Sequence, residues 1–339
     1  METETLQTIL NEFEIKGHFS IAQAKDFTEK CLQKKDEHDG SDDDSGSSQL
    51  SKDNAYKLVK QVLSNPTDGT PGDYHDYAVV FADVDDFTYA CEVLLLGLKK
   101  YSTHIDLLSD FLLYATKSSR NEHYELCEEK YEQLKARRII WNWRAYDFSF
   151  EYLLDKMNYG RCDIEKLKAE CLDLTREFQT YIPDNELGYI DEAIIFSTFR
   201  EYDKEKSTLE KAYNKKNIPV VRVGITLARI YLKEGKPDMA MECLLSVIKN
   251  IPRVVTIISP ERAWLLLIIS KIAKLLNSAT LYFNDRQKVD TPLVKEIVND
   301  WNKIKSISNA NAQIYKDVKG LVEFIKAIND YKSNDDEEL

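Results

Sequence analysis

The stretch VRVGITLARIYLKEGKPDMAMECLLSVIKNIPRV, residues 221–254, decides the fold of this 339-residue chain. It contains two runs in which apolar residues recur at helical spacing, separated by Gly235 and Pro237, a helix stop followed by a helix start. Pro252 closes the second run. The apolar positions are Leu227, Ala228 and Tyr231 in the first run and Ala240, Leu244, Val247 and Ile248 in the second. The stretch therefore predicts two helices that are joined by a tight turn and pack against each other.

The spacing of these residues resembles the tetratricopeptide repeat, an antiparallel helix pair of about 34 residues. Only Gly224 departs from the pattern, at a position where that family prefers tryptophan or another large residue. Residues 71–104 and 104–137 fit the template more weakly, and a degenerate copy carries Arg200 in place of the turn glycine. The resemblance covers roughly residues 71–254 and implies an all-α fold, a right-handed α-solenoid of antiparallel helix pairs.

Other segments flank the array at 71–254. Helical periodicity predicts an N-terminal helical segment over residues 1–64, which contains an acidic linker at 36–49, and dense turn residues place its boundary at about 65–72. Residues 255–331 are expected to form capping helices, because the last helix of a solenoid needs a polar outer face. Residues 332–339 are an acidic tail.

Composition limits the class of protein. The chain contains only 11 Gly and 8 Pro, which favours helices over folds that are rich in turns. A net charge of −12 disfavours nucleic acid as a partner, since phosphate binding depends on Lys and Arg. Residues 215–274 nevertheless contain 11 Lys and Arg against 4 Asp and Glu. This basic segment is expected to face either the acidic groups of a partner or the acidic ends of the same chain.

The chain is expected to be a cytoplasmic protein that does not associate with a membrane. Its N-terminus shows no basic segment followed by an apolar run, and the apolar stretch at 263–276 is short and interrupted by Lys271 and Lys274. The six cysteines are at least nine residues apart, which excludes the close spacing of zinc or redox pairs. They are interpreted as reduced, mostly buried thiols.

No catalytic, cofactor or metal motif stands out. The sequence contains no phosphate-binding glycine loop and no HExxH zinc pattern. His123 and Cys127 are one helical turn apart, but two ligands do not complete a zinc site. His75 stands among Asp73, Asp76 and Asp83, which are interpreted as acids near a helix start. We therefore predict no catalytic residues, no cofactor and no metal.

The segment KARRIIWNWRAYDFSFEYLL, residues 135–154, is rich in aromatic residues and arginine. If it is a helix, it is apolar on more than one side, which is typical of a helix buried between neighbours. The alternative is an exposed binding surface made by Arg137, Trp141 and Arg144. One apolar stripe would consist of Ile139, Trp143, Tyr146, Phe150 and Leu153.

The resemblance implies that the first helix of the pair at 221–254 faces a concave groove. Carried over position by position, the residues that line the groove are Arg222, Ile225, Arg229, Leu232 and Lys233. Arg222, Arg229 and Lys233 share one stripe, and related repeats hold a peptide's carboxylates with such stripes. The alternative is a solvated helix face that keeps the solenoid in solution.

These patterns together predict a non-catalytic scaffold or adaptor, an accessory or regulatory subunit that binds another protein or a peptide. The basic residues favour a partner with acidic groups. Two alternatives stay open. One is a peptide-sensing signalling regulator whose N-terminal helices are the output, and the other is an enzyme with an unrecognised site. The sequence leaves the partner and the oligomeric state open.

Overall fold

The computed structural model describes residues 20–32, 45–65, 68–137, 140–159, 163–215, 221–250, 260–282, 291–304, 316 and 318–323. Every regular element within these ranges is an α-helix, which confirms the predicted all-α class. None of the helices in this part of the chain is both long enough and apolar enough to cross a membrane. The right-handed sense of the solenoid stays a prediction.

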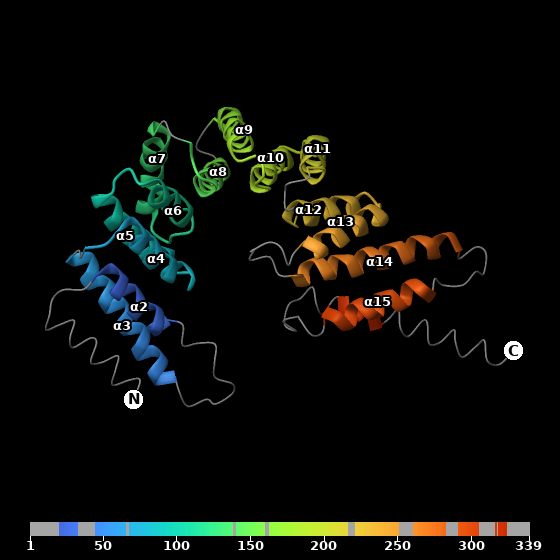
Figure 1. Ribbon diagram of the computed structural model, residues 1–339, viewed down its shortest axis with the longest axis horizontal. Coiled ribbons are helices and arrows are strands. Elements are labelled where there is room, and N and C mark those ends of the chain that lie inside the picture. Colours follow the sequence, from blue (N-terminus) through green and yellow to red (C-terminus); the bar gives the residue numbers. More distant parts are fainter. Residues whose placement is uncertain are drawn as a thin grey trace. The chain divides into compact units, whose positions relative to one another are not determined.

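The chain divides into two compact units, residues 1–174 and 175–339 (Figure 1). The first unit contains α2 (Ile21–Leu32), α3 (Ser45–Ser64), α4 (Pro71–Ala82), α5 (Phe87–Lys100), α6 (Ile105–Ala115), α7 (Asn121–Ala136), α8 (Trp143–Asn158) and the first part of α9 (Ile164–Tyr181). The second contains the rest of α9, α10 (Leu187–Thr198), α11 (Tyr202–Tyr213), α12 (Val221–Lys233), α13 (Pro237–Asn250), α14 (Pro260–Tyr282) and α15 (Thr291–Ile304).

Consecutive helices pack as pairs in both units. In the first unit α2 packs on α3, α4 on α5 and α6 on α7, and the first helices α2, α4, α6 and α8 also contact one another in that order. The second unit repeats the arrangement with α10 and α11, α12 and α13, and α14 and α15, and α12 contacts both α10 and α14. Each unit is therefore a stack of helix pairs, as the repeat pattern predicts.

The N-terminal helix pair packs directly on the next pair. The Thr28 hydroxyl lies 3.2 Å from the Tyr77 hydroxyl, and the Ile21 amide donates to the Asp68 carbonyl at 3.4 Å. The predicted boundary at 65–72 therefore separates two helix pairs within one compact unit. The predicted linker at 36–49 is too long, because α3 already begins at Ser45, and residues 36–44 lie outside the described part.

The C-terminal helices continue the stack, since α14 packs on α12 and α13 and α15 packs on α14. Their role as capping helices stays a prediction. The buried Lys271 on α14 donates to Asp300 on α15 at 2.6 Å and lies 2.9 Å from Glu296. Trp301 is almost fully buried in the same helix pair. The predicted helix at about 311–331 is described only at residues 316 and 318–323, which are helical, and the acidic tail at 332–339 lies outside the described residues.

Three of the turns between paired helices have the same backbone geometry. Asp85, Arg200 and Gly235 have φ angles of 60°, 60° and 71°. In each turn the next amide donates to the carbonyl five residues earlier, at 2.9 Å after Asp85, 2.7 Å after Arg200 and 2.8 Å after Gly235. This is the usual glycine-type end of a helix. The degenerate copy with Arg200 therefore forms the same turn, although it lacks the glycine that usually marks this turn in a sequence.

Replacing Arg200 with glycine is expected to stabilise the second unit by about 0.5–1 kcal/mol. A left-handed conformation costs an L-residue about 1–2 kcal/mol, and glycine's larger entropy in the unfolded chain offsets part of that gain. Gly235→Ala is the matched control and is expected to destabilise by about 1 kcal/mol. Urea denaturation measures both, and a loss of stability in Arg200→Gly contradicts the argument.

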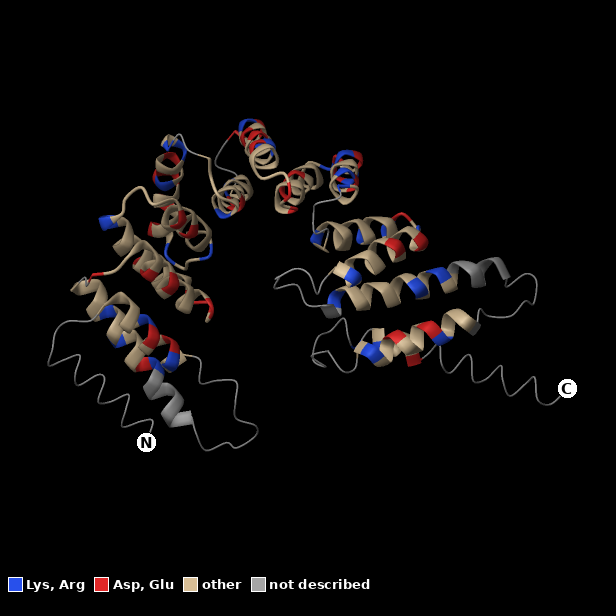
Figure 2. Ribbon diagram, in the orientation of Figure 1, with Lys and Arg blue, Asp and Glu red and all other residues tan. Residues whose placement is uncertain are grey.

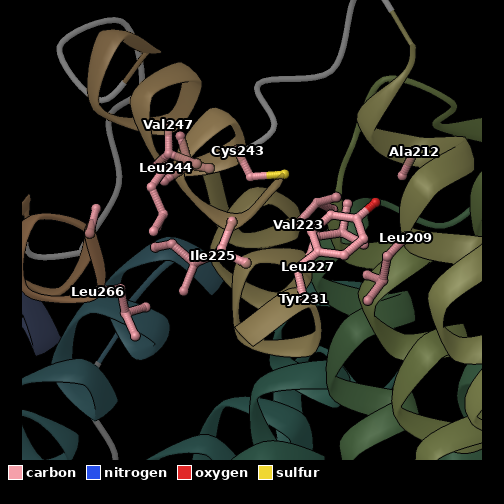
Figure 3. Packing of buried hydrophobic residues seen from close by; sticks show 14 of the residues in the cluster. Leu209, Ala212, Val223, Ile225, Leu227, Tyr231, Cys243, Leu244, Val247 and Leu266 are labelled. Carbon is pink, nitrogen blue, oxygen red and sulfur yellow. The ribbon is translucent and has the colours of Figure 1, made fainter. Parts of the chain in front are cut away.

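The core of the second unit lies between α10, α11, α12, α13 and α14. Figure 3 shows labelled side chains from the last four of these helices, which lie on both sides of Leu227. At Gly224 a methyl group would lie 2.4 Å from Val247 Cγ2 and 3.6 Å from Tyr213 Cε2. Gly224 therefore departs from the family pattern because Val247 and Tyr213 already fill the space beside it.

The cysteines match their predicted interpretation where the structure describes them. Five of them lie buried in the helix pairs, and Cys162 is outside the described residues. Burial raises the pKa of the Cys127 thiol to about 12 and that of Cys243 to about 11. These thiols are therefore protonated at neutral pH and poor nucleophiles.

Candidate partner-binding site

Helix α12 is two-sided. Its buried face consists of Val221, Val223, Gly224, Ile225, Leu227, Ala228 and Tyr231. Arg222, Arg229 and Lys233 are exposed, and their separations of seven and eleven residues place them along one side of the helix. Of the other residues predicted to line the groove, Ile225 is buried and Leu232 is half-buried. The exposed side of α12 is therefore basic (Figure 2).

The three cations of α12 lack close anionic partners. Among the residues that the structure describes, none of the three lies within 4 Å of a carboxylate oxygen. Nearby lysines behave differently, because Lys206 and Lys236 share Glu234 at 2.7 and 2.8 Å. The charge of the exposed side of α12 is therefore not neutralised by this part of the chain.

A buried carboxylate fixes the start of α12. Glu186, just before α10, accepts hydrogen bonds from the amides of Arg222 at 2.9 Å and Val223 at 3.2 Å. These amides belong to the first turn of α12, where no carbonyl of the helix can accept from them. Burial raises the pKa of Glu186, although these amides and the Arg222 charge oppose the shift. Sequence patterns miss this cap because it joins two successive helix pairs.

The second predicted cluster, Arg137, Trp141 and Arg144, lies in the first unit and makes internal contacts. Trp141 is only 8% exposed and its ring lies 5.3 Å from the ring of Tyr146. Arg137 donates to the Thr103 carbonyl. Trp141 is therefore not available at the surface, whereas Ile140 and Trp143 of the same segment are 64% and 43% exposed.

Arg144 is part of a charged network that spans three helices. Its guanidinium donates to Asp110 Oδ1 at 2.6 Å, and His75 Nδ1 lies 2.6 Å from Asp110 Oδ2. The guanidinium also lies 3.3 and 3.4 Å from the two ring nitrogens of His75. Asp110 is fully buried, so its charge depends on these two partners. The network joins α4, α6 and α8.

Helical spacing does not distinguish the two tryptophans of this segment, but the structure does. Trp143, which belongs to the apolar stripe, is 43% exposed, while Trp141, a candidate for the exposed binding surface, is buried. Helix α8 begins only at Trp143, because Asn142 caps it by accepting from the Ala145 amide at 2.9 Å. Trp141 therefore lies in the segment before the helix and folds onto Tyr146. The N-cap asparagine was the signal that could have located this start.

The His123–Cys127 pair does not form a nucleophilic site. The Cys127 thiol donates to the His123 carbonyl at 3.6 Å, and the His123 ring contacts Ser118 Oγ at 2.8 Å and Glu92 at 3.4 Å. Burial lowers the pKa of His123 and raises that of Cys127, so both groups stay neutral. No three potential metal ligands come together within the described residues.

Comparisons with known proteins find similarity in fold. No protein-family model matches the sequence, and no curated protein matches it. TTC0263, a thermophilic tetratricopeptide protein of Thermus thermophilus, has 15% identity and a TM-score of 0.43 over 61% of this chain and all of its own. Yeast Tom70 has 14% identity and a TM-score of 0.43, over 97% of this chain and 74% of its own.

A third solved structure, the human IFIT1 dimer with PPP-AAAA, has 14% identity and a TM-score of 0.40, over 93% of this chain and 70% of its own. At such identities the likeness concerns the fold alone. The description of this chain as an array of tetratricopeptide-like helix pairs rests on its own turns at Asp85, Arg200 and Gly235 and on the stacking of its helices.

Proposed function

We propose that this chain is a non-catalytic adaptor or accessory subunit that binds an acidic segment of another protein along α12. The observation that carries the proposal is the exposed row of Arg222, Arg229 and Lys233, without a carboxylate within 4 Å among the described residues. Charge complementarity of this kind raises association rates and selects acidic partners.

Apolar side chains accompany the cations. Ile230 and Leu232 on α12, Ile190 on α10 and Trp264 on α14 are each only partly buried against the core of the second unit. Apolar anchors beside basic groups fit a partner segment that mixes acidic with apolar residues. Arg137, Trp141 and Arg144 take no part in this proposal, because their described contacts are internal.

The proposal is tested with a fluorescein-labelled peptide of alternating Glu and Leu residues and the full chain. Arg229→Glu combined with Lys233→Glu is expected to weaken binding at least about tenfold at roughly 50 mM salt, and less at 500 mM, where screening is stronger. Lys211→Glu with Lys249→Glu is the matched control, since both lysines are exposed on α11 and α13, the second helices of their pairs. Equal losses in both double variants would contradict the assignment to α12.

The predicted alternatives lead to different measurements. A peptide-sensing regulator requires α2 and α3 to respond to the peptide, and unchanged hydrogen exchange in both helices at saturation rejects it. An enzyme requires a site other than the neutral His123–Cys127 pair. The proposal also includes a cytoplasmic location and the absence of membrane and nucleic-acid partners. A salt-sensitive mobility shift of mixed RNA by the protein would contradict the absence of a nucleic-acid partner.

A further inference from the structure

Three of the first helices in the first unit, α4, α6 and α8, carry the opposite net charge to α12. Helices α4 and α6 contain two acids each and no Lys or Arg (Figure 2). Helix α8 contains three acids and two bases, and both bases are paired, Arg144 with the buried Asp110 and Lys156 with Glu128 on α7. A ligand that approaches α4 or α8 meets the exposed carboxylates of Asp76 and Glu151.

An exposed aromatic pair lies on α8 among these acids. Trp143 is 43% exposed, and its ring is 6.3 Å from the ring of the half-buried Phe148 in an edge-to-face arrangement. The Arg144 guanidinium lies 5.6 Å from the centre of the Phe148 ring and makes a cation–π contact with it. Exposed tryptophans of this kind are typical of binding hot spots.

Side-chain contacts connect the residues next to the aromatic pair with acids on α4 and α6. Asp106 on α6 accepts from Asn142, the residue directly before Trp143, at 2.6 Å. His75, which contacts Arg144, lies 3.9 Å from Asp76 on α4, whose side chain is 62% exposed. Glu151 is exposed two turns further along α8. We call Asp76, Asp106, Trp143, Phe148 and Glu151 the Trp143 surface.

We infer that the Trp143 surface binds a segment of another protein that carries Lys or Arg beside apolar residues. Trp143 offers an aromatic face to a cation, and the carboxylates of Asp76, Asp106 and Glu151 also attract a positively charged ligand. An acidic segment is repelled here, so this surface and the basic side of α12 select different ligands. The inference is independent of the proposed role of α12.

The test uses fluorescence anisotropy of the full chain with three labelled peptides of one length, which alternate Leu with Arg, Gln or Glu. The Arg peptide is expected to bind at least about tenfold more tightly than the Gln peptide at roughly 50 mM salt. Trp143→Ala is expected to weaken that binding about fivefold or more, and Trp143→Phe to restore part of it.

Charge is tested separately with Asp76→Asn combined with Glu151→Gln, which is expected to weaken Arg-peptide binding about tenfold. Glu122→Gln with Glu125→Gln on α7 removes the same charge from exposed positions and is expected to leave the affinity unchanged. The Arg229→Glu, Lys233→Glu variant is also expected to bind the Arg peptide normally, which separates this inference from the role of α12.

Three results would overturn the inference. One is equal binding of the Arg and Gln peptides, and another is equal weakening by the α7 control variant. The third is a salt-sensitive self-association in sedimentation velocity that Trp143→Ala and Arg229→Glu each abolish, because the occupant would then be the basic side of α12 in a second copy of the chain.

Discussion

Arg144→Met is expected to destabilise the first unit by about 3 kcal/mol or more. The substitution keeps a long apolar stem but removes one of the two partners of Asp110, which is fully buried on α6. Removing one member of a buried charged pair typically costs about 3–5 kcal/mol, because the other charge stays buried without compensation. Because His75 remains 2.6 Å from Asp110 as a second partner, we expect a loss of stability toward the lower end of that range.

The matched control is Arg229→Met, which removes an exposed arginine of α12 and is expected to change stability by less than about 0.5 kcal/mol. Urea denaturation gives the stability, and hydrogen exchange of the α6 amides locates the change in the first unit. Adding Asp110→Asn to Arg144→Met removes the buried charge and is expected to recover part of the loss. Equal effects of Arg144→Met and Arg229→Met would show that Asp110 does not depend on Arg144.

Gly224→Trp is expected to destabilise the second unit by about 3 kcal/mol or more, although tryptophan is the residue that the resembling family prefers there. The first side-chain carbon would already lie 2.4 Å from Val247 Cγ2 and 3.7 Å from the Cys243 carbonyl oxygen. Forcing even a few extra carbon atoms into a packed core costs about 1–3 kcal/mol, and an indole side chain adds many more atoms than that.

Thermal and urea unfolding measure this loss, with Gly320→Ala as the control. A methyl group at Gly320 would have no atom within 4 Å, so its better helix propensity is expected to stabilise the chain by up to about 1 kcal/mol. Gly224→Ala is expected to cause a smaller loss of stability than Gly224→Trp. Adding Val247→Ala to Gly224→Ala removes the clashing methyl group and is expected to recover part of that loss. A Gly224→Trp variant as stable as the parent would contradict the packing of α12 on α13.

Local signals were sufficient for the clearest helix pair. Gly235 and Pro237 mark the turn between α12 and α13, and the apolar stripes that precede and follow it are buried where the spacing predicts. Such signals depend on residues within one or two turns of each other, which the sequence displays directly. The same reasoning failed at Trp143, because helical spacing does not reveal on which residue a helix begins.

The amino-acid sequence by itself determined the helical class, the pairing of α12 with α13 and the basic side of α12, because each follows from neighbouring residues. Only the tertiary structure decided which charged and aromatic side chains face outward. Arg144 is held by Asp110, 34 residues away, and the amide of Arg222 by Glu186, 36 residues away. Those partners lie on other helix pairs, so stacking, rather than periodicity, separates the internal arginine from the exposed ones.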